Sequence, residues 1–101
     1  MQAPGELVEL VRGIFAAACE AERCAADETL FELGGDSVRA AEIASVLESA
    51  LELPITVDVV LESLTPSALA ARVADLWRAQ RRDLPALSAC LGELAAESAS
   101  A

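Results

Sequence analysis

Histidine, lysine and tyrosine are absent from this chain of 101 residues, and only three residues are aromatic. Without histidine, the chain has no Ser-His pair for nucleophilic catalysis and no imidazole ligand for a metal ion. Seven arginines stand against seventeen acids, and the net charge of −10 excludes a nucleic acid partner because phosphate contacts would form in a repulsive field. No apolar run approaches the roughly 18 residues of a membrane span, so we expect a soluble cytoplasmic protein.

The three cysteines, Cys19, Cys24 and Cys90, match no CxxC zinc or redox spacing. A disulfide between Cys19 and Cys24 would close only a short loop in a reducing compartment. We therefore expect free, partly buried thiols and no bound metal.

The negative charge is concentrated towards the start of the chain. Residues 1–71 hold three arginines and thirteen acids, whereas residues 72–101 hold four of each. A basic protein partner would be attracted to the acidic part of the chain.

Apolar residues recur at helical spacing in four segments, which predicts an all-α domain. The predicted helices run from about Glu6 to Cys19, from Ser37 to Leu51, from Val57 to Ser63, and from Pro66 onwards. Thr56 and Thr65 are good N-caps for the last two helices, and Pro66 suits a first helical position. The third helix is short.

The character of the chain changes after residue 82. Leu84, Leu87, Leu91 and Leu94 lie at heptad-like intervals, but Gly92 weakens a helix and the last residues are of low complexity. We expect a domain over residues 1–82 and a weakly helical or disordered tail over residues 83–101. A fifth helix packed back on the bundle, or a docking segment, is the alternative.

The long loop before the second helix carries the most informative segment of the chain. Leu30, Phe31 and Leu33 are expected to anchor this loop in the core. The Gly34-Gly35 pair permits a sharp turn, and Ser37 is expected to be the N-cap of the second helix with its hydroxyl at the surface.

The second helix has one broad apolar arc, and its predicted core residues are Ala40, Ile43, Ala44, Val46, Leu47, Ala50 and Leu51. Val38 and Ala41 fall instead on the polar arc beside Ser37. These two residues indicate either a contact surface or an ordinary exposed valine.

A catalytic role for Ser37 is disfavoured. Gly35-Asp36-Ser37-Val38 is superficially similar to the block that opens GDSL-type hydrolases, but the chain lacks the histidine base. The nucleophile elbow G-x-S-x-G fails because residue 39 is arginine, and no phosphate-binding glycine loop is present.

Two motifs resemble those of a known family. Phe31-Glu32-Leu33-Gly34-Gly35-Asp36-Ser37 is similar to the prosthetic-group site of carrier proteins, and nearest to the peptidyl (thiolation) carriers of nonribosomal peptide synthesis. Leu61-Glu62-Ser63-Leu64-Thr65-Pro66-Ser67-Ala68-Leu69-Ala70 resembles the third helix of these carriers and their entry into helix four. The resemblance covers about Leu7 to Arg78.

This resemblance implies a four-helix bundle with a short third helix and no catalytic activity of its own. It implies that a phosphopantetheinyl transferase attaches 4'-phosphopantetheine to Ser37, using coenzyme A and magnesium, with Asp36 and Gly35 exposing the serine. The arm would hold an aminoacyl or acyl thioester, received from an adenylation or acyl-loading enzyme and passed to condensing or tailoring enzymes. The implied partner face of the monomer consists of Val38, Ala41, Val59 and Val60.

Several alternatives stay open. Valine at position 38 replaces the leucine that is usual in the family, which indicates altered partner contacts. Asp36 also occurs in acyl and aryl carriers, so an acyl carrier of a polyketide or fatty-acid pathway is the second interpretation. The initial methionine and the small polar tail suggest a freestanding carrier, against a domain excised from a synthetase. A helical interaction module without modification is a further alternative.

Overall fold

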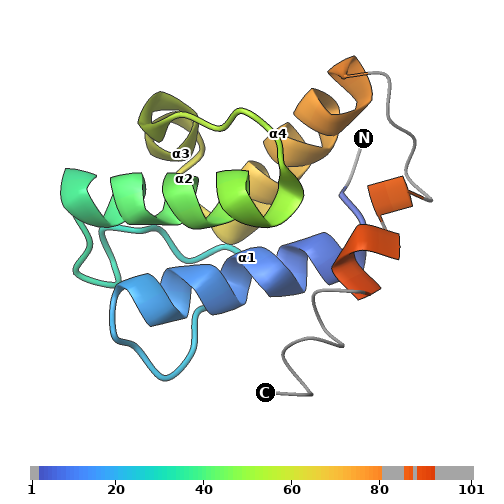
Figure 1. The fold of residues 1–101 in the computed structure, drawn as a ribbon. Coiled ribbons are helices and arrows are strands. Elements are labelled where there is room, and N and C mark those ends of the chain that lie inside the picture. The colour runs from blue at the N-terminus through green and yellow to red at the C-terminus, as the bar shows by residue number, and fades with distance from the viewer. Residues whose placement is uncertain (1–2, 81–85, 88, 93–101) are drawn as a thin grey trace.

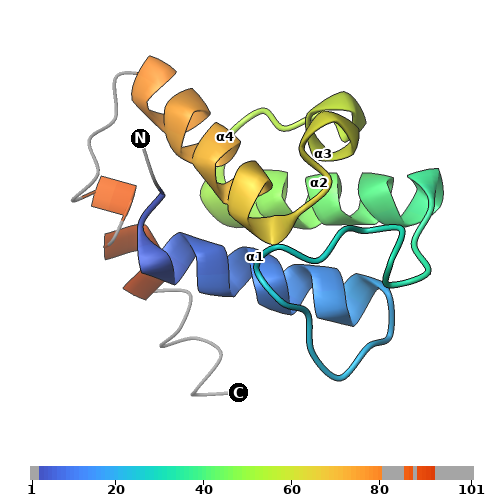
Figure 2. The same ribbon diagram turned by 180° about the vertical axis from the view of Figure 1, so that it is seen from behind.

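The computed structural model describes residues 3–80, 86–87 and 89–92. It contains helices α1 (Gly5–Ala18), α2 (Ser37–Leu51), α3 (Val57–Ser63) and α4 (Pro66–Ala79), with no strand among the described residues. Helices α1 and α2 lie side by side and run in opposite directions, α4 packs on α1, and α3 packs on α2 and α4 (Figures 1 and 2). The all-α prediction, including the short third helix, is confirmed.

The helix boundaries follow the local capping signals. The predicted bounds of α2 and α3 agree with the structure, and α1 begins and ends one residue earlier than expected. Thr56 Oγ1 accepts a hydrogen bond from the Val59 backbone N–H at 3.4 Å, and Thr65 Oγ1 accepts one from Ala68 at 3.2 Å. Pro66 is the first residue of α4, where its missing N–H costs no helical hydrogen bond.

All four helices contribute to one apolar core. None of the described buried side chains is polar or charged. Fully buried members from the four helices include Leu7, Val11, Phe15, Ile43, Leu47, Leu51, Val60, Leu69 and Val73. The only tryptophan, Trp77, closes the core from α4 and is 4% exposed.

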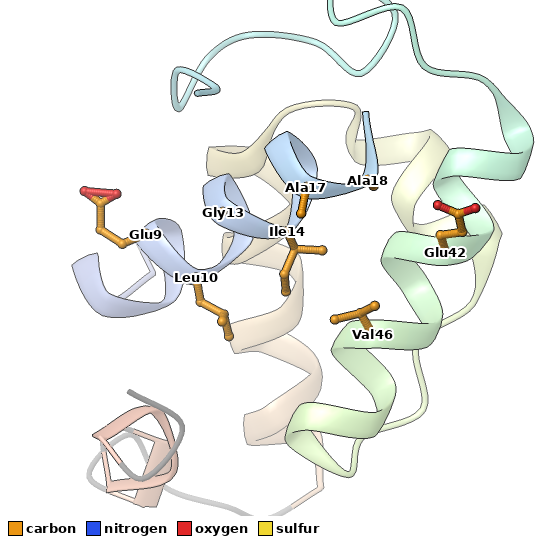
Figure 3. A pocket seen from close by; sticks show the side chains of 8 residues that line it. All are labelled: Glu9, Leu10, Gly13, Ile14, Ala17, Ala18, Glu42 and Val46. Carbon is orange, nitrogen blue, oxygen red and sulfur yellow. The ribbon is translucent and has the colours of Figure 1, made fainter. Parts of the chain in front are cut away.

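Two residues that were predicted to be buried lie at the surface. Val46 is 49% exposed and Phe31 is 58% exposed. Val46 lines an open groove with Leu10, Ile14 and Ala17 of α1, so its side chain stays half-exposed (Figure 3). In the loop, the neighbouring Leu30 takes the buried position instead of Phe31.

A helical segment near the C-terminus belongs to the core. Leu87 is 0% exposed and Leu91 is 6% exposed, and Cys90 Sγ lies 3.9 Å from the carbonyl oxygen of Ala50. This segment lies beside the first turns of α1 (Figures 1 and 2). Leu87 and Leu91, which were predicted to lie in the C-terminal tail, therefore pack with the helices of the bundle. Leu84 and Leu94 lie outside the described residues.

Candidate functional site

The loop between α1 and α2 is held against the junction of α3 and α4 by two backbone hydrogen bonds. Leu30 N–H donates to the Leu64 carbonyl at 2.9 Å, and Ser67 N–H donates to the Ala26 carbonyl at 2.9 Å. Leu30 itself is fully buried. The loop that leads to α2 is therefore fixed to a segment that lies far from it in the sequence but next to it in the fold.

A reciprocal pair of hydrogen bonds shapes the turn that follows. Thr29 N–H donates to Glu32 Oε1 at 2.8 Å, and Glu32 N–H donates to Thr29 Oγ1 at 3.1 Å. This is the arrangement of a capping box. Hydrogen bonding to Thr29 holds the pKa of Glu32 below its ordinary value. The Thr29 backbone has the larger effect and the Thr29 side chain the smaller one.

The two glycines have different roles in the turn. Gly34 has a φ of +82°, which is a backbone conformation that residues with a side chain rarely adopt. Gly35 donates its N–H to the Leu30 carbonyl at 2.9 Å, and a Cβ at this position would lie 2.5 Å from Leu30 Cδ1. The close approach of the chain to Leu30 therefore requires glycine at position 35.

Asp36, and not Ser37, is the N-cap of α2. Asp36 has an extended backbone, with a φ of −145°, and its Oδ1 accepts a hydrogen bond from Arg39 N–H at 3.0 Å. Ser37 is the first residue of the helix and is exposed. The prediction that Ser37 caps α2 is therefore wrong, because the Asp36 carboxylate is the capping group.

The four residues predicted to form the partner face differ in their exposure. Val38 is 62% exposed, and Ala41 is exposed on the next turn of α2. Val59 on α3 is partly buried against the core, whereas Val60 is 0% exposed. Val60 was predicted to contact partners, but its side chain points into the core and has no surface to offer.

Phe31 is a surface residue that sequence reasoning missed. It precedes the glycine turn by three residues, and its carbonyl accepts a hydrogen bond from Gly34 N–H at 3.0 Å. The sequence did contain a signal for this exposure, because Phe31 directly follows another apolar residue, Leu30. Consecutive residues in a tight turn seldom both point into the core. We define the carrier face as Phe31, Val38, Ala41 and Val59.

The three cysteines lie outside the serine turn. No disulfide joins Cys19, Cys24 or Cys90 in the part of the chain that the structure describes, and burial raises the pKa of Cys19 and Cys24. Among the described residues, no group of three or more His, Cys, Asp or Glu side chains is placed to hold a metal ion. No helix in the described ranges has the length and apolar character to cross a membrane.

The described helices form a small bundle that exposes Ser37 at the start of α2, directly after the glycine turn. The family model described as "Phosphopantetheine attachment site" matches residues 6–73. The chain therefore belongs to the phosphopantetheine-binding carrier family, and 4'-phosphopantetheine is its cofactor.

Solved structures of carriers have the same fold. The chain is 24% identical to BlmI, a type-II acyl carrier protein from Streptomyces verticillus involved in bleomycin biosynthesis, with a TM-score of 0.64, and the match covers 66% of this chain and 81% of BlmI. The PaxA T1-CDD/PaxB NDD docking domain complex of the Pax nonribosomal peptide synthetase is 19% identical, with a TM-score of 0.71, over 90% of this chain and 86% of that one.

A third structure belongs to a much longer protein. The nonribosomal peptide synthetase FmoA3 is 28% identical to this chain, with a TM-score of 0.65, and the match covers 69% of this chain. It covers only 8% of the FmoA3 chain, so the likeness concerns one domain of that synthetase.

Proposed function

We propose that Ser37 is the residue to which 4'-phosphopantetheine is attached, and that the loaded protein presents aminoacyl or acyl groups to biosynthetic enzymes. The observation that carries this proposal is the position of Ser37: it is exposed, it begins α2, and it directly follows Gly34-Gly35-Asp36 within the matched residues 6–73.

The residues around Ser37 fit a phosphate ester. The first N–H groups of α2 point towards its N-terminus, and the helix dipole favours negative charge there. Asp36 already occupies the Arg39 N–H, so the backbone N–H groups of Ser37 and Val38 are the ones that face the phosphate. Ser37 is exposed, which leaves its hydroxyl accessible to a transferase.

The attachment reaction is a nucleophilic substitution at phosphorus. The Ser37 hydroxyl loses its proton to a base of the transferase, and its Oγ forms a bond to the phosphorus that carries the pantetheine chain of coenzyme A. The P–O bond of the pyrophosphate breaks, and adenosine 3',5'-bisphosphate leaves with magnesium neutralising its charge. When attached, the group supplies a flexible arm with a thiol that holds the cargo as a thioester.

The pathway we propose is nonribosomal peptide or hybrid natural-product synthesis. The 28% identity to one domain of the synthetase FmoA3 supports this pathway, as does the Phe31 to Ser37 motif. An acyl carrier of a polyketide or fatty-acid pathway is the second candidate, because the acyl carrier BlmI has the same fold. The freestanding, monomeric state and the cytoplasmic location stay predictions.

The carrier face is proposed to receive the partner enzymes. A phosphopantetheinyl transferase, an adenylation or acyl-loading enzyme, and condensing or tailoring enzymes would each approach Ser37 over Phe31, Val38, Ala41 and Val59. Exposed apolar side chains around a modified residue are the composition of a small, transient interface.

Intact mass measurement tests the assignment of Ser37. The folded chain is incubated with coenzyme A, magnesium and a transferase of broad specificity, and we expect a gain of one phosphopantetheine. Ser37→Ala should gain nothing, whereas Ser45→Ala, which removes another exposed serine of α2, should be modified like the original chain. A gain that survives Ser37→Ala, or no gain with several transferases, overturns the proposal.

A second experiment identifies the cargo class. The modified protein is offered to its adenylation or ligase partner with a panel of amino acids and fatty acyl groups, and the loaded mass is read. Preferential loading with amino acids is expected, and exclusive loading with malonyl or fatty acyl groups would favour the polyketide or fatty-acid pathway.

A further inference from the structure

An apolar groove of about 510 Å³ lies between α1 and α2. Figure 3 shows Leu10, Ile14 and Ala17 of α1 and Val46 of α2 pointing into it. Val46 is 49% exposed, so about half of this apolar side chain is in contact with solvent. The carrier reaction uses none of these residues.

Gly13 lies in the wall of this groove, and no contact among the described residues requires a glycine there. It occurs in the middle of α1, where glycine destabilises a helix relative to alanine. Its φ is not positive, and an added Cβ would meet nothing within 4 Å. Neither backbone strain nor internal packing therefore accounts for this glycine, whereas close approach of another backbone through the groove does.

The groove and Ser37 lie on opposite sides of α2. Val46 follows Ser37 by nine residues, and at about 100° per residue their side chains project in opposite directions. A molecule seated against Val46 therefore leaves the serine hydroxyl free.

Charge at the groove indicates the chemistry of its occupant. Glu9 and Glu42 flank the apolar lining on opposite sides, and none of the lining residues is basic (Figure 3). The ion pairs of these carboxylates, with Arg12 and Arg39, are solvent-exposed and hence weak. Residues 1–71 carry the whole net charge of −10. An apolar surface with carboxylates at its edges favours a partner with apolar and basic side chains together.

We propose that this groove is a second docking surface that binds an amphipathic, basic helix of a partner protein. Ser37 stays available for attachment of the phosphopantetheine arm and transfer of its cargo while that helix is bound. A helix fits because α1 and α2 offer a groove between two helices, into which a third helix packs its side chains. The last residues of this chain, 93–101, hold two acids and no base, and a second copy would bring more carboxylates, so both are disfavoured as occupants.

The test uses a synthetic amphipathic helix of leucine and lysine, 14 residues long like α1, and the same peptide with glutamate in place of lysine. Each is titrated into the complete ¹⁵N-labelled chain, unmodified at Ser37, and followed by amide chemical shifts. We expect saturable changes at Gly13, Ala17 and Val46 with the lysine peptide, weaker binding at higher salt, and no binding of the glutamate peptide.

Matched variants separate the groove from the carrier face. Val46→Arg should raise the dissociation constant by about tenfold or more, because it removes apolar contact and repels the lysine side chains. Ala41→Arg adds the same charge on the carrier face, about 140° around α2 from Val46, and should leave the constant unchanged. Gly13→Ala should raise the melting temperature through its helix propensity and still weaken peptide binding.

Three results overturn the proposal: shifts that map to Phe31 and Val38, equal binding of the glutamate peptide, or self-association of the chain that Val46→Arg abolishes. The last would make a second copy the occupant. Modification of Ser37 with and without saturating peptide is measured in parallel. An unchanged rate is expected, and a blocked rate contradicts the separation of the two surfaces; a failure of Ser37 to be modified at all concerns only the attachment proposal.

Discussion

Leu30 and Gly35 approach each other so closely that a Cβ on the glycine would lie 2.5 Å from Leu30 Cδ1 and 2.9 Å from the Leu30 carbonyl oxygen. Gly35→Ala is therefore expected to destabilise the domain by about 1–3 kcal/mol, because neither the buried leucine nor its backbone has room to move. Urea unfolding followed by circular dichroism measures the change. Gly34→Ala is the comparison: its Cβ meets nothing, so only the strain of its φ of +82° contributes. A Gly35→Ala variant as stable as the original would refute this contact.

Asp36 and Ser37 make different contributions to the start of α2. Asp36→Ala should cost about 1 kcal/mol of unfolding free energy because the Arg39 N–H loses its acceptor. Asp36→Asn should retain most of that stability, since the amide oxygen accepts the same bond. Ser37→Ala should be nearly neutral in thermal unfolding; a larger loss for Ser37→Ala than for Asp36→Ala would reverse the two roles.

The capping box at Thr29 and Glu32 predicts a pH dependence. The pKa of Glu32 is lowered in the folded protein, so its carboxylate contributes stability above its ordinary value of 4.5, and this contribution is lost as the pH falls through the lower, folded value. Glu32→Gln should therefore be less stable than the original chain at neutral pH, and the difference should shrink below pH 4.5. Thermal unfolding across this range measures it. Parallel stability curves at every pH would contradict the assignment.

The C-terminal segment is expected to contribute to stability. Leu87 is fully buried, so Leu87→Ala should cost about 2–5 kcal/mol in chemical denaturation. Gly92→Ala changes the same segment at an exposed helical position with open space around it, and should be neutral or stabilise by up to about 1 kcal/mol. If Leu87→Ala is as stable as the original, the segment does not belong to the core.

Val38 tests the carrier face. Val38→Asp should leave the fold intact, because the side chain is exposed and an acid in the first turn of a helix is favourable. Loading by the cognate adenylation or acyl-loading enzyme should fall by about tenfold or more in kcat/KM. Val46→Asp, about two turns further along α2, should load normally. Equal loading of all three proteins would remove Val38 from the interface.

The parts of the fold that depend on local chemistry could be predicted from the sequence. Thr65 and Pro66 fix the start of α4 through one capping bond and one backbone restriction, and the structure begins the helix there. Asp36 and Ser37 are both good caps, so composition alone does not choose between them. The choice depends on which residue has the extended backbone, and the turn before them decides that.

Burial across helices was harder to predict. The helical wheel places Val46 in the apolar arc of α2 but contains no information on how closely α1 approaches it. In the structure an open groove separates the two helices at this point. Val60 shows the opposite error, because it was predicted to lie at the surface and is buried. Its helix, α3, has seven residues, which make too few turns to show which of its faces packs on the core. Leu87 and Leu91 were predicted to lie in a C-terminal tail because the residues that follow them are of low complexity. Both leucines are buried in the structure.

The bonds from Leu30 to Leu64 and from Ser67 to Ala26 have a consequence for engineering this carrier. A hybrid that exchanges only α2 and its preceding loop would pair one parent's loop with the other parent's α3–α4 junction. Transplants that move residues 26–36 together with residues 64–67 keep both ends of each bond from one parent. Recombination sites placed outside this pair of segments should yield folded hybrids more often than sites between them.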